Sequence, residues 1–187
     1  MGLISTPAPV KLFCGILLRD FGMIEDVIAR LEALASAADY CSLPVDFTFT
    51  TYYEKEMGPG LHRMFVSFER RIDPAQIAGI KIATNQIERE MSDPPLTSSR
   101  RRVNLDPGFL TPHSVVLAST KDYQHRIPAG RGIYLEQEML FTRKEPVFLP
   151  WTYPDYRSPD YVQIFLQMHQ IERRSRFSAD GARSQMP

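Results

Sequence analysis

The stretch Lys11–Leu18, KLFCGILL, is a continuous apolar run that is typical of a central β-strand buried on both faces. Asp20 then stands where a helix N-cap is expected, and apolar residues follow it at helical spacing until about Ser36. The beginning of the chain therefore predicts a buried strand that leads directly into an amphipathic helix.

The next segments complete a recognisable order of elements. Strands are expected at Ser42–Tyr53, where apolar and polar side chains alternate, and at His62–Arg71. Asp73–Gln76 supplies an N-cap, a proline at the first helical position and the glutamine of a capping box, which predicts a helix to about Met91. With Val103–Leu110 as a further strand candidate, the order β-α-β-β-α-β resembles the split βαβ (ferredoxin-like) arrangement, with helices on one face of a mostly antiparallel sheet.

The remainder of the chain is rich in β-strand signals and ends in a helix. Pro107-Gly108 suggests a turn, and Ser114–Ser119 is compatible with a strand or a helix. A hairpin is expected between His125 and Thr142, and Ser158-Pro159 begins a last helix. The sequence thus predicts an α+β protein with a single domain over residues 11–176, between a disordered leader (1–10) and a disordered tail (177–187).

The composition is that of a globular protein. Of the 187 residues, 43% are hydrophobic and 24% are charged, and 22 basic residues balance 22 acidic ones. A formal net charge of zero gives no global attraction to nucleic acid or anionic lipid, so nucleic-acid binding would need a local patch. The sequence shows no secretory signal and no apolar run of the roughly 18 residues that a membrane span needs, which predicts a cytoplasmic protein without a membrane partner.

The two cysteines, Cys14 and Cys41, lie in apolar surroundings without a CxxC or CxxH spacing. We interpret them as buried thiols in a reducing compartment, with a disulfide or a redox role as the alternative.

Several strong catalytic motifs are absent from the sequence. It has no GxxxxGK[ST] loop and no GxGxxG after a strand, and the resemblance of Ser119–Asp122 to a guanine-reading box fails because the Asp comes one residue early. The four histidines are scattered, which argues against a zinc site, and no metal ligand is predicted. An oxygen-rich Mg²⁺ or Mn²⁺ site from Asp106, Glu136 and Glu138 remains open, although we favour a solvated strand face for the two glutamates.

The polar stretch Arg100–Arg126 is the strongest candidate for a site. Its arginines suit phosphate or carboxylate oxygens, Asn104 and Asp106 share one strand face, and a titratable His125 follows Lys121 closely. A network of ion pairs that only ties loops together is the structural alternative for the same residues.

Four longer stretches also resemble one known family. They are DFTFTTYYEKEMGPGLHRMFVSFERRIDP, RRVNLDPGFLTPHSVVLASTKDYQHRI, GIYLEQEMLF and LPWTYPDYRS. Together they resemble the bacterial family catalogued as domain of unknown function 4416, from about Lys11 to about Ile171. The resemblance implies no activity, substrate or cofactor, but it marks as signature positions Tyr53, Glu54, Lys55, Glu56, Asn104, Asp106, Gly108, Thr120, Lys121, Asp122, His125, Arg126, Trp151, Tyr153 and Asp155.

Our leading hypothesis is one pocket that binds, and in an enzyme transforms, a small anionic or phosphate-bearing ligand. His125 is then the expected proton carrier and Asp106 the expected orienting or metal-binding carboxylate. The expected ligand-binding residues are Lys121, Arg126, Asn104, Tyr53, Glu54, Lys55 and Asp122. The alternative is an adaptor without catalytic activity that binds RNA or a protein through its arginines and aromatic residues. The sequence names no cofactor and fixes no oligomeric state.

Overall fold

The computed structural model describes residues 2–93 and 101–183, with side chains described up to residue 175. In this part of the chain, nine strands form one antiparallel sheet in the order β2-β4-β1-β5-β6-β8-β7, with β3 paired to β4 and β9 paired to β8. The strands are β1 (Val10–Leu18), β2 (Ala38–Cys41), β3 (Val45–Asp46), β4 (His62–Ile72), β5 (Val103–Leu110), β6 (Ser114–Ser119), β7 (Ile127–Pro128), β8 (Tyr134–Leu140) and β9 (Val147–Phe148). The α-helices are α1 (Ile24–Leu34), α2 (Glu54–Met57), α3 (Ile77–Glu90) and α4 (Pro159–Arg183).

The strand order confirms the predicted split βαβ start. β4 lies between β1 and β2, and β1 lies between β4 and β5, so a strand of the other unit separates the two strands of each β-α-β unit. β1 is central as expected, and all nine of its residues are buried. The predicted helix start at Asp73–Gln76 is also confirmed, because the Asp73 side chain accepts from the N–H of Ala75 and Gln76 reaches back to the N–H of Asp73.

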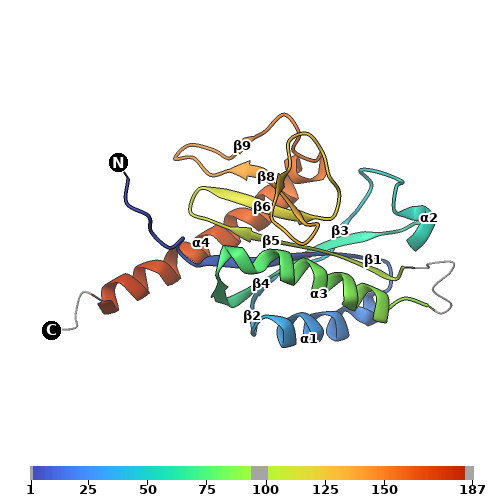
Figure 1. Ribbon diagram of the computed structural model, residues 1–187. Coiled ribbons are helices and arrows are strands. Elements are labelled where there is room, and N and C mark those ends of the chain that lie inside the picture. Colours follow the sequence, from blue (N-terminus) through green and yellow to red (C-terminus); the bar gives the residue numbers. More distant parts are fainter. Residues whose placement is uncertain (1, 94–100, 184–187) are drawn as a thin grey trace.

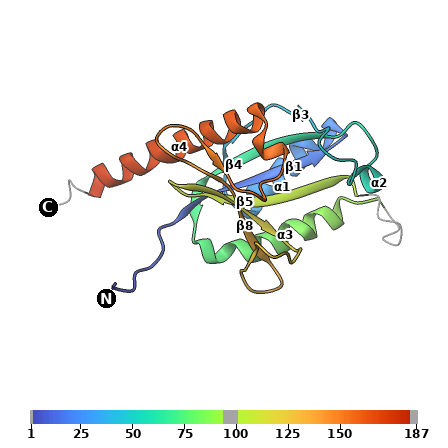
Figure 2. The same cartoon turned by 90° about the horizontal axis from the view of Figure 1, so that it is seen from above.

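The two helices of the split βαβ start, α1 and α3, lie on one face of the sheet as expected, and α4 covers the other face (Figures 1 and 2). α1 and α3 pack on one face over alternate residues of β1, such as Cys14 and Ile16. α4 crosses the opposite face, where the ring centroids of Phe165 and Phe13 lie 5.2 Å apart. Arg71 of β4 donates from Nε to the buried carboxylate of Glu172 at 3.0 Å, which fixes α4 to the sheet.

The strand expected at Ser42–Tyr53 is wrong. The segment forms a strand only at Val45–Asp46, apart from one backbone hydrogen bond from Ser42 to Phe65, and then runs irregularly to α2. The alternation arises because Phe47 packs against Phe49 and Tyr53, with ring centroids 6.0 and 5.9 Å apart. Side-chain alternation here reflects a cluster of rings beside a pocket, and not a strand.

The turn expected at Pro107-Gly108 is also wrong, because both residues lie inside β5. β5 pairs with β1 from Val103 to Leu110, but with β6 only at Gly108–Leu110. The two strands therefore separate before Gly108, next to a proline that has no backbone N–H to donate. This separation opens the sheet at the place where the candidate site lies.

Gly108 is required where β5 and β6 meet. A Cβ atom there would lie 2.3 Å from the carbonyl oxygen of Val116 and 2.5 Å from the ring of Phe13. We expect Gly108→Ala to lower the free energy of unfolding by about 1–3 kcal/mol, because a backbone atom cannot move aside cheaply. Urea denaturation measures this loss.

Gly79→Ala in α3 is the matched control. Its Cβ would meet only the flexible end of Arg131 at 3.3 Å, and alanine favours a helix over glycine by up to about 1 kcal/mol. Equal losses for the two variants would contradict the role of Gly108.

The cysteines and the two ends of the chain agree only in part with what the sequence predicts. Cys14 is buried as predicted, but Cys41 is exposed at the end of the edge strand β2, and neither forms a disulfide. α4 extends to Arg183, and the disorder predicted for the leader and the tail stays a prediction. Arg100, which belongs to the polar stretch, and residues 94–99 before it lie outside the described residues. None of the helices in the described part is long and apolar enough to cross a membrane.

Candidate functional site

The first of two neighbouring pockets, here called the central pocket, lies where β5 and β6 separate. Its cavity volume is about 660 Å³. One wall is aromatic and comes from the irregular segment before α2, with Phe47, Phe49, Tyr52 and Tyr53. The sheet, α3 and the segment after β9 supply the remaining, mostly polar, lining.

The floor of the central pocket holds a buried ion cluster around Asp106. Arg63 of β4 donates from Nη1 to Asp106 Oδ2 at 2.8 Å, and Lys81 Nζ lies 3.5 Å from Oδ1. Arg63 and Lys81 are only 4% and 6% exposed. Burial alone would raise the pKa of Asp106, but Lys81 and Arg63, with hydrogen bonds from Arg63 and Asn104, hold it below its ordinary value. Asp106 is therefore ionised and balances two buried cations.

A second group of ion pairs closes the end of the pocket near α2. Arg101 donates to Glu56 at 2.6 Å and to Asn104 Oδ1 at 2.6 Å, and it lies 3.5 Å from Glu88. Asn104 in turn donates to Asp106 Oδ2 at 2.6 Å. These contacts connect the two groups into one network across α2, α3 and β5.

Several donors in the central pocket have no acceptor among the described residues. Tyr53 and Tyr156 line it, and their hydroxyl groups have no hydrogen-bond partner among the described residues. Burial raises the pKa of both tyrosines well above the ordinary value, so both hydroxyls keep their protons at neutral pH. Arg63 donates from Nη1 to Asp106, and its buried Nε has no hydrogen-bond partner among the described residues.

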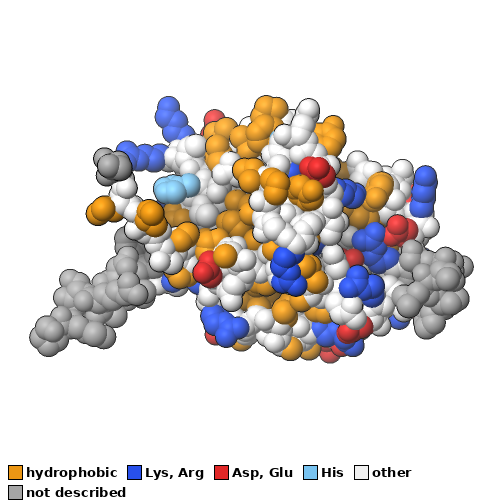
Figure 3. Space-filling view, viewed as in Figure 1, with side chains coloured by type: hydrophobic (Ala, Val, Ile, Leu, Met, Phe, Trp, Pro, Cys, Tyr) orange, Lys and Arg blue, Asp and Glu red, His pale blue; other side chains and the backbone are white. Residues whose placement is uncertain are grey.

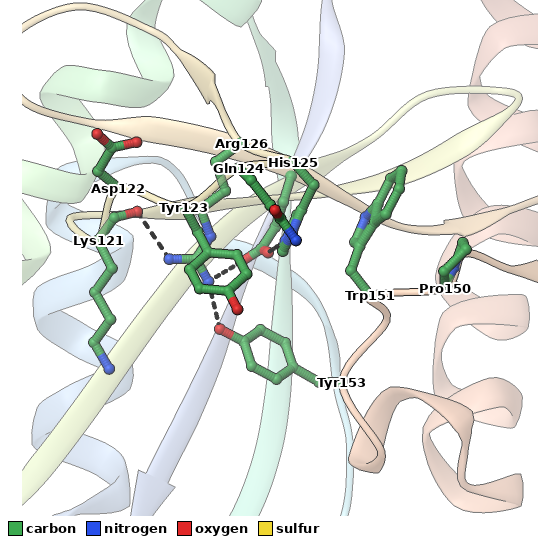
Figure 4. Close-up of a pocket in the computed structure, with 10 residues that line it drawn as sticks. Lys121, Asp122, Tyr123, Gln124, His125, Arg126, Pro150, Trp151 and Tyr153 are labelled. Carbon is green, nitrogen blue, oxygen red and sulfur yellow. Dashed lines mark hydrogen bonds and ion pairs between the residues drawn. The ribbon is translucent and has the colours of Figure 1, made fainter.

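The second pocket, here called the outer pocket, lies beside the β6–β7 connection. Its cavity volume is about 770 Å³. Figure 4 shows its residues, with Arg126 directed at the hydroxyl group of Tyr153. Lys121, Glu136 and Tyr153 line both pockets, so the two share a wall.

His125 is held on three sides in the outer pocket. Its Nε2 lies 2.8 Å from Glu136 Oε2. Its ring stacks on Trp151 at a centroid distance of 5.0 Å and an interplanar angle of 10°, and Tyr123 meets it edge-on at 5.3 Å. The imidazole therefore has little freedom to rotate.

Glu136 and Glu138 are buried, with exposures of 3% and 0%, so the expected solvated strand face is wrong. Glu136 Oε1 lies 2.8 Å from Arg126 Nη2, and Glu138 Oε2 accepts from the N–H of Tyr153 at 3.1 Å. Burial and the charge of Glu136 raise the pKa of Glu138 to about 8. Glu138 is therefore mostly protonated at neutral pH.

The structure brings the expected site residues together in two groups. Asp106, Asn104 and Tyr53 line the central pocket, while His125, Arg126 and Asp122 line the outer one. Lys121 lines both. The predicted pair of Asp106 and His125 is thus divided between adjacent pockets, and the carboxylate that contacts His125 is Glu136.

Two further expected ligand-binding residues lie elsewhere. Glu54 and Lys55 are exposed on α2 and belong to the lining of neither pocket. Their neighbour Glu56 is the member of α2 that reaches the network, through Arg101.

Sequence reasoning missed Arg63 and Lys81, which hold Asp106. A signal was present for Lys81, because it occupies the buried stripe of α3 between Ile77 and Thr84 at helical spacing. Arg63 likewise stands among the buried residues of β4, where a charged side chain needs a partner.

No group of three or more His, Cys, Asp or Glu side chains in the described residues is arranged to hold a metal ion. No curated protein and no solved structure shows significant similarity to the chain. The family model DUF4416, described as a domain of unknown function, matches residues 8–171. This match extends from the leader to α4 and includes every residue of both pockets, and the chain belongs to the DUF4416 family.

Proposed function

We propose that the protein binds a small anionic ligand in the central pocket. The surplus of hydrogen-bond donors carries this proposal. Tyr53 and Tyr156 line the pocket and have hydroxyl groups that no described residue accepts, and Arg63 lines the same pocket. A ligand rich in anionic oxygen atoms would accept hydrogen bonds from these hydroxyl groups.

The charges around the pocket support an anionic ligand. Arg63, Lys81 and Arg101 are each paired with a carboxylate. Lys121 and Arg89 also line the pocket, and neither has a carboxylate within 4 Å among the described residues. Among the described residues, the Nζ of Lys121 contacts Tyr52, at 3.3 Å from its hydroxyl oxygen and 4.4 Å from its ring centroid. These two cations are available for a phosphate or carboxylate group.

The aromatic wall indicates the other part of the ligand. Phe47, Phe49, Tyr52 and Tyr53 give an apolar surface against which a flat ring can pack. The class that fits best is therefore a ring compound with a phosphate or carboxylate group. The site lies within the single domain expected over residues 11–176, in a protein that we expect in the cytoplasm.

A thermal-shift panel tests the proposal directly. It would contain nucleoside monophosphates, sugar phosphates and aromatic carboxylates, with inorganic phosphate to separate binding of the anion alone. We expect a concentration-dependent rise in Tm for ring compounds with an anionic group. A panel without any such rise would refute the proposal.

Lys121→Gln should weaken the affinity of the best panel compound about tenfold, because one charge-assisted hydrogen bond is lost. Isothermal titration calorimetry measures the affinity. The control is Lys144→Gln, an exposed lysine in the β8–β9 turn outside both pockets. Equal affinities for the two variants would show that the anion does not bind at Lys121.

One observation favours the adaptor as a second candidate. Tyr52, Tyr123 and Trp151 are 56%, 60% and 38% exposed, as rings that stack on RNA bases often are. On the face in Figure 3, however, Lys and Arg side chains are spread among acidic and hydrophobic ones. Binding of single-stranded RNA that weakens steeply with salt would support the adaptor.

A further inference from the structure

We propose that the outer pocket is a hydrolytic site, in which His125 takes a proton from water and the water attacks an ester group of the ligand. Glu136 positions His125. The inference rests on the proposed function, because the ester would belong to an anionic ligand held in the central pocket.

The contact between His125 and Glu136 defines which ring nitrogen is reactive. Glu136 accepts the Nε2 hydrogen across 2.8 Å when its carboxylate is ionised. The neutral imidazole then carries its proton on Nε2 and a lone pair on Nδ1. Nδ1 has no hydrogen-bond partner among the described residues, and His125 lines the outer pocket.

Glu136 contacts a cation on the side away from His125. Arg126 Nη2 lies 2.8 Å from its second oxygen, Oε1. The other nearby carboxyl group, on Glu138, is mostly protonated because its pKa is about 8. The carboxyl group of Glu136 thus lies between the guanidinium of Arg126 and the imidazole of His125.

The geometry around His125 suits a proton acceptor. Trp151 and Tyr123 fix the plane of its ring, so little reorganisation is needed when the imidazole gains charge. Tyr153 and Lys121 line both the outer pocket of His125 and the central pocket. Both are donors that can stabilise negative charge on an attacked ester.

The step balances with water as the only co-reactant. A water molecule gives one proton to His125 Nδ1, and its oxygen forms a bond to the ester carbon or phosphorus. The bond from that atom to the alcohol oxygen breaks. The alcohol oxygen then takes the proton from the imidazolium, which returns His125 to its neutral form.

The tautomer of His125 is the first test. Nitrogen-15 NMR of the full chain, with His125 assigned through His125→Gln, should show a protonated Nε2 and an unprotonated Nδ1 in the neutral ring. In Glu136→Gln the preference should weaken, because the amide can also donate to Nε2. A neutral His125 that carries its proton on Nδ1 would overturn the proposal.

Hydrolysis is the second test, with p-nitrophenyl acetate for a carbon centre and p-nitrophenyl phosphate for a phosphorus centre. We expect the full chain to hydrolyse at least one probe, and His125→Gln to lower its kcat about 100-fold. Glu136→Gln should lower kcat about tenfold or more with little change in KM, as expected of a positioning residue. His113→Gln, an exposed histidine in the β5–β6 turn, should retain the wild-type rate.

The outcomes distinguish this inference from the proposed function. If His125→Gln hydrolyses both probes at the wild-type rate, or the wild type hydrolyses neither, hydrolysis at His125 is refuted. Binding of a panel compound in the central pocket would then still stand. If no panel compound binds, the proposed function fails and the ligand-directed hydrolysis fails with it.

Discussion

Asp106→Asn is expected to lower the free energy of unfolding by about 3–5 kcal/mol. The substitution keeps the shape of the side chain but removes the charge that balances Arg63 and Lys81. Both cations are almost fully buried, so water cannot replace the lost carboxylate. Urea denaturation at neutral pH measures the loss.

The pH dependence adds a signature to this prediction. A carboxyl group with a lowered pKa stabilises the fold above its ordinary pKa, and the stabilisation disappears as the pH falls through the lowered value. The difference between wild type and Asp106→Asn should therefore shrink in strong acid. Asp26→Asn is the control, because its pair with Arg30 on α1 is exposed and contributes about 0.3–0.5 kcal/mol. Similar losses for the two variants would contradict a buried ion cluster.

Glu138→Gln is expected to stabilise the protein at alkaline pH. The pKa of Glu138 is raised to about 8 in the folded protein, so the fold holds a proton that the unfolded chain releases at lower pH. Stability therefore decreases as the pH rises from the ordinary carboxyl range towards about 8. Between about pH 5.5 and about pH 8 this loss is about 3 kcal/mol, and the neutral glutamine avoids it.

Urea denaturation across this pH range provides the measurement. Glu138→Gln should match the wild type at about pH 5 and exceed its stability at about pH 8. Glu145→Gln, an exposed glutamate in the β8–β9 turn, should follow the wild type at every pH. A wild type whose stability does not fall between these values would contradict a protonated, buried Glu138.

The fold could be predicted where the signal is local. The apolar run of β1 and the capping box of α3 are properties of a few neighbouring residues, and both form as expected. The segment Phe47–Tyr53 could not be predicted in this way. Its alternating rings pack around a pocket. Alternation in the sequence indicates which side chains are buried, but it does not indicate whether the backbone pairs with another strand.

The sequence by itself determined the split βαβ order and singled out Lys121–Arg126 as a polar segment between strands. Only the tertiary structure decided which side chains contact Asp106 and His125. Arg63 reaches Asp106 across 43 residues, and the register of β8 on β6 sets Glu136 against Leu117, where it meets His125. The physical reason is that the sequence supplies the charged groups, whereas their pKa values and interaction energies depend on burial and on neighbouring charges. Burial and these neighbours arise only when the sheet has formed.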